Sequence, residues 1–410
     1  MSLNRVVITG RGAVSPFGIG VAALTDNVWQ GNSGVRVMDE WRDIKGMHSF
    51  LAAPVPDIDS KKLLSRNLRR TMGRMAIYST IAAREAVEDS GIDEVMLASG
   101  RVGVVIGSTT GSPEAYEEFY TKFIPERSIE EMRSGIFFRI MGHSCAANVS
   151  FALGIKGEQW APASACTSAA QAIGLAYLLV KSGRQDAVLC GGADEVHHSV
   201  TMVFDVVKAA SRKLDQPPAT PSPFDRNRDG VVCGGGSGII TVESLESARR
   251  RGAHIYAEIT GFGNVNDNTH IANPHEQSMA RAIHYALDEG GTAGESIDYV
   301  NAHATGTEQG DVAEARAIAL ALNKKVPVSS IKGHIGHTLG AAGSLETIVL
   351  LEMLERREII PTLHLNDPDP ACTGVDLVRR RKKKDLHTVL KNNFALGGVN
   401  TSLVLRRCEI

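Results

Sequence analysis

Cys166 is the residue whose setting most favours chemistry. It follows the small residues 161–165 and precedes the apolar run 172–180. This pattern predicts a turn between a strand and a helix, where free backbone N–H groups and the positive end of the helix dipole favour a thiolate. Cys166 is therefore a candidate nucleophile. The alternative for a lone cysteine is a small buried apolar residue.

Two distant histidine motifs favour the catalytic interpretation. His303 lies in the segment 301–307, between a strand-like and a helix-like stretch, and His337 lies in the glycine-punctuated segment 330–343. Loops at the ends of elements are where scaffolds usually present reactive groups. A single loop histidine is more often an ordinary surface residue. A cysteine and two histidines, each at a strand–turn–helix junction, together predict one site.

The elements that must position these residues alternate along the chain. Short β-branched runs are followed by longer helical patterns, which predicts an α/β fold with helices covering the sheets. The expected strands are 102–106, 187–190, 256–260, 297–300, 326–329 and 402–406, and the expected helices are 74–89, 168–181, 278–289, 312–322 and 344–356. The helix after Cys166 is apolar nearly all round, so we expect it inside the molecule. No sequence repeat of fixed period is visible.

Composition narrows the class of protein. The 410 residues can form two cored domains or one large duplicated α/β unit. The net charge of −2 argues against bulk attraction to nucleic acid or membrane. We expect neither a transmembrane helix nor a signal peptide, and hence a cytoplasmic protein. The six cysteines lack metal-binding spacing, which indicates reduced thiols and no metal site.

The whole chain resembles the β-ketoacyl-[acyl-carrier-protein] synthases of the elongating types I and II, in the thiolase superfamily. The resemblance is carried by Ser-Ala-Cys at Cys166, His-x-Thr-x-Thr from His303 and Lys-x-x-x-Gly-His ending at His337. It implies a duplicated, thiolase-like α/β fold with two halves stacked in five αβαβα layers. Residues 1–252 would form the half with the nucleophile, and residues 253–410 the half with both histidines.

The resemblance also implies a reaction, a decarboxylative Claisen condensation in fatty-acid or related lipid or polyene biosynthesis. Cys166 would take an acyl group from acyl carrier protein as a thioester. His303 and His337 would stabilise the enolate formed when malonyl carrier protein loses CO2, and the product would be 3-oxoacyl carrier protein. The backbone N–H groups of Cys166 and Leu396 would form the oxyanion hole. The resemblance implies no cofactor besides the carrier protein's phosphopantetheine.

Six further positions match family motifs and would have supporting roles. They are a lysine with its acidic partner, two threonines and two acids, namely Lys332, Glu346, Thr305, Thr307, Asp311 and Glu314. The lysine would keep nearby imidazoles neutral, while its acidic partner offsets the cost of burying it. The threonines would bind the phosphopantetheine amides. The two acids would orient the histidine loop.

Cations recur every three or four residues on a probable helix, and four of them are candidate docking residues: Lys61, Lys62, Arg66 and Arg69. Because acyl carrier protein is small and strongly acidic, a positive helix face would speed its docking, and the resembled enzymes use this region for it. A nucleic-acid partner would favour aromatic residues among the cations and a basic domain, and neither is present. The expected assembly is a homodimer, or a heterodimer with a related subunit.

One departure bears on the substrate. After Phe394, the family's Gly-Phe-Gly-Gly is replaced by the segment 395–398, so Leu396 stands where a gating phenylalanine is common. Acyl-chain preference is therefore open, and a specialised polyketide or polyene ketosynthase is an alternative function.

Other relatives of the same fold differ at the candidate site. A non-catalytic subunit of the chain-length-factor type is a second alternative, but such subunits typically lack the nucleophile. Degradative thiolases need a second cysteine near the C-terminus, and Cys372 and Cys408 lie outside any Cys-x-Gly motif. Initiating synthases carry asparagine in place of His337.

Overall fold

The computed structural model describes residues 3–130 and 132–408. Its strands are β1 (Val6–Ser15), β2 (Gly18–Ile19), β3 (Arg36–Val37), β4 (Leu51–Ala53), β5 (Val102–Gly107), β6 (Gln159–Trp160), β7 (Ala187–Asp194), β8 (Cys233–Gly234), β9 (Gly236–Ser244), β10 (Ala257–Asn266), β11 (Tyr299–Asn301), β12 (Pro327–Ser329), β13 (Glu358–Ile359), β14 (Asp376–Leu377), β15 (Lys382–Lys383), β16 (Thr388–Phe394) and β17 (Val399–Arg406).

The helices are α1 (Val21–Gln30), α2 (Ser60–Leu63), α3 (Arg66–Arg69), α4 (Arg74–Ser90), α5 (Glu94–Leu97), α6 (Pro113–Phe123), α7 (Gly135–Ile140), α8 (Ser144–Leu153), α9 (Ser168–Lys181), α10 (His198–Val206), α11 (Leu245–Arg250), α12 (Glu276–Glu289), α13 (Glu308–Leu322), α14 (Lys332–Ile335) and α15 (Ala342–Arg356). Two short 3-10 turns also bear on the site, η2 (Ala165–Thr167) and η5 (Leu339–Ala341). Among the described residues, no helix is long and apolar enough to cross a membrane.

Two half-sheets meet along one strand pair. The first has the order β6-β5-β7-β9-β1, and the second has the order β10-β17-β16-β11-β12-β14. They join through β1 and β10, which pair antiparallel only where Val6–Ile8 faces Ala257–Ile259. In each half-sheet the central parallel strands, β5 with β7 and β11 with β16, are buried along their whole length because helices cover both of their faces.

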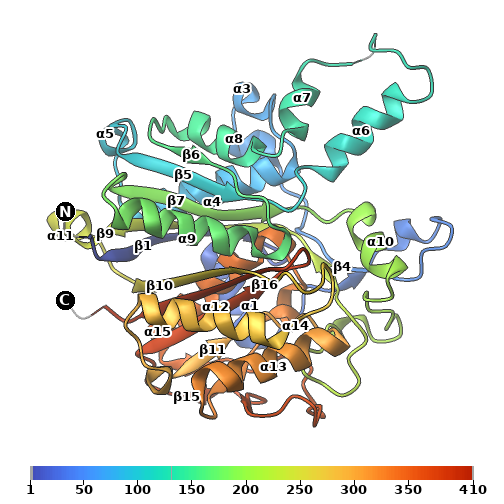
Figure 1. The fold of residues 1–410 in the computed structure, drawn as a ribbon. Coiled ribbons are helices and arrows are strands. Elements are labelled where there is room, and N and C mark those ends of the chain that lie inside the picture. Colours follow the sequence, from blue (N-terminus) through green and yellow to red (C-terminus); the bar gives the residue numbers. More distant parts are fainter. Residues whose placement is uncertain (1–2, 131, 409–410) are drawn as a thin grey trace.

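Helices separate and cover these half-sheets in five layers (Figure 1). Helix α4 covers the outer face of the first half-sheet, α12 covers that of the second, and α9 and α15 lie between the two. Helix α9 contacts β5 and β7 on one side and β10 and β17 on the other, which confirms the burial expected from its apolar circumference. This is the expected layered, thiolase-like arrangement.

The two halves repeat a structural detail that no sequence period shows. In β1 a register shift precedes Gly10, and in β10 an equivalent shift precedes Gly261. Two residues after each shift, a glycine lies against a helix backbone. A Cβ added at Gly12 would lie 1.9 Å from the carbonyl oxygen of Ala82, and one at Gly263 would lie 1.9 Å from that of Ala282. In each half, a glycine thus lets the outer helix pack against the strand backbone at the same close distance.

The boundary expected between residues 252 and 253 lies in the connection from α11 to β10. That each half is a separate domain stays a prediction, because the shared middle layer of α9 and α15 packs against both half-sheets.

Candidate active site

Cys166 lies in the middle of η2, directly before α9, so the predicted turn at a helix start is confirmed. Ala165 adopts a left-handed φ of 48°, a strained conformation for a residue with a side chain. Two hydroxyls hold the turn: Thr167 donates to the carbonyl of Ser164 at 2.8 Å, and Ser168 donates to that of Ala165 at 2.8 Å. The Cys166 side chain is thereby fixed in the interior, with 6% of the residue exposed.

A second turn of the same form faces the first. Turn η5 precedes α15 as η2 precedes α9, and Leu339 has a φ of 50° where Ala165 has 48°. The two turns pack together. Gly340 occupies the position equivalent to Cys166, and its N–H donates to Asp194 at 2.6 Å.

The structure brings Cys166, His303 and His337 together from these distant segments. The cysteine sulfur and a ring nitrogen of each histidine all lie within 4.8 Å of one another. The two imidazole rings are 5.1 Å apart and nearly perpendicular, at 82°. All three side chains are buried. One sulfur and two imidazole nitrogens are also the donor types of a zinc site, so metal content is a necessary control in any assay.

Hydrogen bonds define how each histidine presents its proton. The N–H of Leu339 donates to Nδ1 of His337 at 3.3 Å, which leaves the proton of a neutral ring on Nε2. That Nε2 is buried and has no hydrogen-bond partner among the described residues. An unpaired buried donor is costly, so His337 is poised to donate to an oxygen of a bound substrate. Nδ1 of His303 lies 3.5 Å from the side-chain nitrogen of Asn393.

The electrostatics differ from one expectation. Burial, with the charge of Lys332, lowers the pKa of both His303 and His337 well below the usual value, so both rings are neutral. The thiolate expected at Cys166 is wrong for the resting site, because burial raises the pKa of that thiol to about 12, although Lys332 opposes the shift. Desolvation of the enclosed sulfur outweighs the effect of the helix dipole.

Lys332 and Glu346 form the expected buried ion pair, on α14 and α15 respectively. A second ammonium group, unforeseen in the sequence, contacts the same carboxylate: Nζ of Lys391 lies 2.6 Å from Glu346 Oε2. The available signal was a lysine in the interior of a strand pattern, Thr388–Phe394, that is otherwise free of charge. Burial alone would raise the pKa of Glu346, but the two lysines hold it below its ordinary value.

Both acids of the Gly-Asp-x-x-Glu motif bind backbone N–H groups of the histidine loop. Glu314 accepts from His303 at 2.8 Å and from Ala304 at 2.6 Å, and Asp311 accepts from Gly306 at 3.2 Å. Burial raises the pKa of Glu314 to about 7 and that of Asp311 to about 6. This is the geometry expected of residues that orient the loop.

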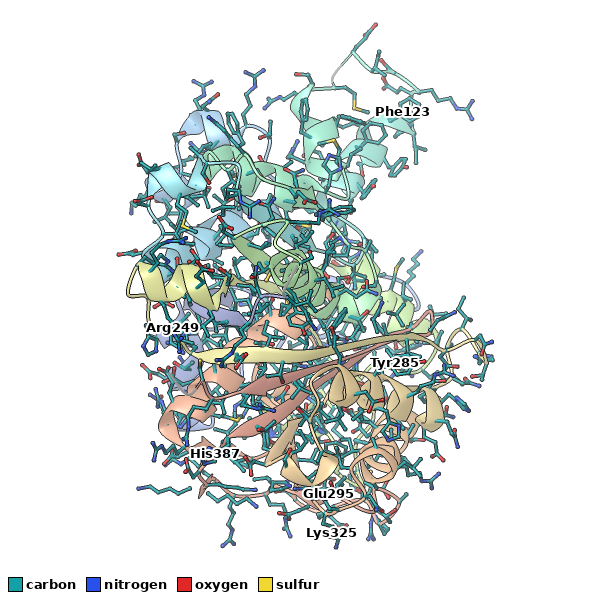
Figure 2. The ribbon with its side chains drawn as sticks, turned by 60° about the vertical axis from the view of Figure 1, so that its left-hand side comes forward. Phe123, Arg249, Tyr285, Glu295, Lys325 and His387 are labelled. Carbon is teal, nitrogen blue, oxygen red and sulfur yellow. The ribbon has the colours of Figure 1, made fainter. Side chains whose placement is uncertain are left out.

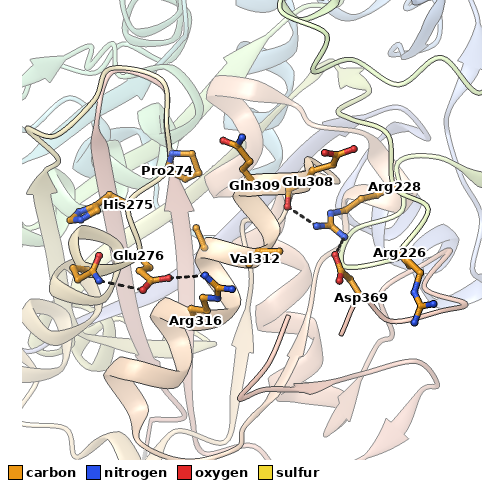
Figure 3. A pocket seen from close by; sticks show the side chains of 12 residues that line it. Arg226, Arg228, Pro274, His275, Glu276, Glu308, Gln309, Val312, Arg316 and Asp369 are labelled. Carbon is orange, nitrogen blue, oxygen red and sulfur yellow. Dashed lines mark hydrogen bonds and ion pairs between the residues drawn. The ribbon is translucent and has the colours of Figure 1, made fainter. Parts of the chain in front are cut away.

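Thr305 and Thr307 lie side by side, with their hydroxyl oxygens 3.2 Å apart. The loop that carries them is held by Arg228, another residue not singled out by sequence, which donates to the carbonyls of Thr307 at 3.0 Å and Glu308 at 2.6 Å (Figure 3). Arg228 also lines a cavity of about 560 Å³ that opens on the outer side of this loop. Cys166, His303 and His337 do not line this cavity, so it is separate from the cysteine–histidine cluster.

The candidate residues of the oxyanion hole and gate near the C-terminus, Phe394 and Leu396, lie in different environments. Phe394 is buried, and its ring lies 6.4 Å from that of His303. Leu396 lies in the turn between β16 and β17, where Gly397 and Gly398 have φ values of 89° and 79°, and it is 47% exposed. Both of these strands pack against η2. The turn therefore adjoins the segment that carries Cys166.

The candidate docking cations do not lie on one continuous helix, and that expectation is wrong. Asp59 caps α2 and Ser65 caps α3, each accepting a backbone N–H, so the chain starts a new helix between Lys62 and Arg66. Lys61, Lys62 and Arg66 are exposed, whereas Arg69 is half-buried and donates to the carbonyl of Leu64 at 3.1 Å. Three of the four candidate docking residues therefore remain exposed cations.

Together, the layered fold and the enclosed cysteine–histidine site define a thiolase-like enzyme. Residues 3–248 match the β-ketoacyl synthase N-terminal domain, and residues 256–366 match the C-terminal domain. The chain is 36% identical to 3-oxoacyl-[acyl-carrier-protein] synthase 2 of Vibrio cholerae, over 99% of this chain and 100% of that protein. The chain therefore belongs to the β-ketoacyl synthase family, and it is an acyltransferase that carries out ketosynthase condensation in fatty-acid or polyketide synthesis.

Solved structures agree over the whole chain. A β-ketoacyl synthase from Burkholderia phymatum has a TM-score of 0.96 at 40% identity and covers 99% of this chain and 100% of its own. The ishigamide ketosynthase/chain length factor has a TM-score of 0.93 at 31% identity and covers both chains fully. A type II polyketide synthase acyl carrier protein in complex with its ketosynthase has a TM-score of 0.91 at 28% identity and covers 100% of this chain and 100% of its own.

Proposed function

We propose that this enzyme condenses an acyl group held on Cys166 with malonyl-[acyl carrier protein], releasing CO2 and 3-oxoacyl-[acyl carrier protein]. The observation that carries the proposal is the unpartnered Nε2 of His337, within the same 4.8 Å cluster as the Cys166 sulfur and His303. Two neutral imidazoles beside a thiol suit an oxyanion that forms only during the reaction.

The first half-reaction is transfer of the acyl group. The sulfur of Cys166 bonds to the carbonyl carbon of the acyl carrier protein thioester, and the bond to the pantetheine sulfur breaks. The thiol proton leaves with the departing pantetheine sulfur, so the exchange is proton-neutral. A permanent thiolate is unnecessary, which agrees with the raised pKa of Cys166.

The second half-reaction is decarboxylation and carbon–carbon bond formation. The bond from the malonyl α-carbon to its carboxylate breaks, CO2 departs, and the electron pair becomes an enolate. The Nε2–H groups of His303 and His337 donate to the enolate oxygen. The enolate carbon then attacks the Cys166 thioester, the carbon–sulfur bond breaks, and the released sulfur takes up one proton. Lys332 and Glu346 hold the histidines neutral and in place for this step.

An acyl carrier protein is the proposed partner that delivers both substrates. A related ketosynthase structure contains such a protein, and here three exposed cations, Lys61, Lys62 and Arg66, offer a surface complementary to acidic residues. Thr305 and Thr307 would bind the amides of its phosphopantetheine arm. No resident cofactor takes part in this proposal.

A second copy of the chain is the proposed subunit partner, and a related subunit is the alternative. Strand β6 ends the sheet, and apolar side chains around it are exposed, including Trp160 on β6, Phe138 on α7 and Phe151 on α8. Helix α8 contacts both β6 and α7, so these elements form one face. An unpaired edge strand with exposed aromatic residues is the signature of an interface.

The test uses a panel of acyl carrier proteins loaded with saturated and unsaturated chains. Intact-protein mass spectrometry should show acyl additions that map to Cys166, and addition of malonyl carrier protein should discharge them as 3-oxoacyl product. Absence of any acylation on metal-free protein would overturn the proposal in favour of a non-catalytic subunit.

A further inference from the structure

Lys391 is a buried charged residue that the proposed mechanism does not use. It lies on β16 between β11 and β17, and its side chain is fully buried. Its Nζ lies 2.6 Å from Glu346 Oε2 and donates to the carbonyl of Asn392 at 2.6 Å and to Asn393 Oδ1 at 2.8 Å. All of its partners are inside the enzyme, so the lysine is an integral part of the site.

The surrounding charges do not balance. Glu346 binds Lys332 through one oxygen and Lys391 through the other, so one carboxylate faces two ammonium groups. The charge of Glu314 also acts on Lys391, but its oxygens bind the histidine loop. Among the described residues no other carboxylate forms an ion pair with either lysine, so one of the two ammonium charges near the histidines has no carboxylate of its own when both lysines are protonated. Such a charge favours the malonyl carboxylate and the enolate that follows it.

Asn393 connects Lys391 to His303. Its side-chain oxygen accepts from Lys391, which turns its NH2 group toward Glu346 Oε2 at 3.3 Å and toward Nδ1 of His303 at 3.5 Å. An NH2 group facing Nδ1 makes that nitrogen the acceptor, so the proton of the neutral ring is on Nε2. This is the tautomer that His337 obtains from the N–H of Leu339.

We propose that Lys391 is a positioning residue of this site: through Asn393 it fixes the His303 tautomer, and with Lys332 it adds a second positive charge for the decarboxylation step. The inference rests on the proposed function and deepens it. A residue in the interior of strand β16 would thus act in the same reaction as the two histidine loops.

Lys391 also makes the site sensitive to pH. Burial lowers the pKa of Lys391 to about 8. Glu346 opposes this shift only in part, and the positive charge of Lys332 adds to it. Below that pH the ammonium form is present, and as pH rises through it the extra charge disappears. Facing Lys391 are Glu346 from α15, Lys332 from α14 and Glu314 from α13, and its charge acts on both histidines. Since burial raises the pKa of Cys166 to about 12, the thiol does not titrate in this range, whereas Glu314, with a pKa of about 7, titrates below Lys391 and does so in the Lys391 variants too.

The variant to test is Lys391→Met, with Leu390→Met on the opposite face of β16 as the matched control. Lys391→Met leaves Glu346 paired with Lys332, so no buried charge is left alone and the fold should persist. Lys391→Arg keeps the charge and serves as the rescue variant. The readout is CO2 release from malonyl-[acyl carrier protein], measured as kcat and KM from about pH 6 to about pH 9.5.

For the unmodified enzyme, kcat should fall as pH rises through about 8. Lys391→Met should lower kcat roughly tenfold to hundredfold at neutral pH and abolish that fall, while Lys391→Arg restores kcat and shifts the fall to higher pH. Leu390→Met should behave as the unmodified enzyme.

The inference is overturned if the unmodified enzyme is active but shows no fall near pH 8, a result that needs no variant to fold. It is equally overturned if Lys391→Met keeps the same profile and rate. Failure of the proposed function is distinguishable, because the unmodified enzyme would then neither acquire an acyl group on Cys166 nor release CO2 at any pH.

Discussion

At the residue scale, the site combines a cysteine thiol that is protonated at rest with a histidine N–H donor that lacks a hydrogen-bond partner. Cys166 is protonated at rest because its sulfur is enclosed, and His337 presents an unsatisfied N–H. The neutral thiol is the stable form in this enclosed site, whereas the unpaired N–H of His337 is costly until a substrate oxygen accepts its hydrogen bond. The strained φ of Ala165 belongs to the same design, since the fold maintains it where the nucleophile must be placed.

Replacement of Cys166 tests whether the acyl group is held on this sulfur. We expect Cys166→Ala to lose the acyl-enzyme mass and to lower condensation by about 10⁴-fold or more, while CO2 release from malonyl carrier protein persists through His303 and His337. Cys190→Ala is the control, because Cys190 is another buried thiol, on β7. Normal condensation by Cys166→Ala would refute the mechanism.

Leu396 tests whether the turn after β16 selects acyl chains. Leucine is smaller than the phenylalanine common at this position, so the unmodified enzyme should accept bulky or rigid acyl groups. Leu396→Phe should slow acylation of Cys166 most for the bulkiest donors and least for short saturated chains. The control is Ile271→Phe, since the Ile271 carbonyl accepts the N–H of Gly397 and its side chain is exposed. A uniform change across the acyl panel would show that position 396 does not select substrates.

Sequence reasoning located the reactive residues, because Cys166, His303 and His337 each lie in a distinctive small-residue or glycine-rich segment. It could not give their ionisation, since burial is a property of the assembled fold. It also missed Lys391, whose function depends on a carboxylate that is 45 positions earlier in the chain and reaches it only through the packing of α15 on β16.

At the element scale, helix caps and glycine contacts decide how the site is framed. The expected cationic helix is two short helices because Ser65 caps the second one, a signal that was present in the sequence. The apolar circumference of α9 predicted its burial, whereas the short strand β6 has no periodic pattern and could not be predicted.

Exposed cations on α2 and α3 should receive the acidic carrier protein. We expect Lys62→Glu with Arg66→Glu to raise the KM for carrier-bound substrates by about tenfold and to leave kcat unchanged. The effect on KM should weaken at high salt. Lys325→Glu with Lys383→Glu makes the same charge change elsewhere on the surface. Lys325 lies at the lower end of Figure 2, opposite Phe123 on α6. Equal KM values for both double variants would move the docking surface elsewhere.

Gly12 should be indispensable to the packing of α4 on β1. In Gly12→Ala the new Cβ meets the Ala82 carbonyl, and the overpacking should cost about 1–3 kcal/mol and lower the thermal midpoint by roughly 1–4 °C. Gly142→Ala is the control, because a Cβ there meets nothing within 4 Å. Differential scanning calorimetry of both variants measures the difference, and equal midpoints would show that the strand and helix can separate freely.

At the scale of the whole molecule, the edge of the first half-sheet at β6 has no neighbouring strand among the described residues of the single chain. The proposed second copy would cover it by continuing the sheet from β6. Phe151→Asp should convert the assembly from dimer to monomer in sedimentation velocity, whereas Val95→Asp on α5, also an exposed apolar residue, should not. A monomer for the unmodified protein would point to a related subunit as the missing partner.

The paired turns η2 and η5 have a consequence for how such an enzyme can change over time. If an ancestral half was copied, both copies began with the same bend ahead of a central helix, and either bend could have carried the nucleophile. In this chain one bend kept a sulfur, and the other became Gly340, whose missing side chain leaves room for Asp194 and the backbone of Thr109. On that history the two copies specialised by loss as well as gain: the second copy, which lacks the sulfur, supplies both histidines, and neither copy holds the whole site alone.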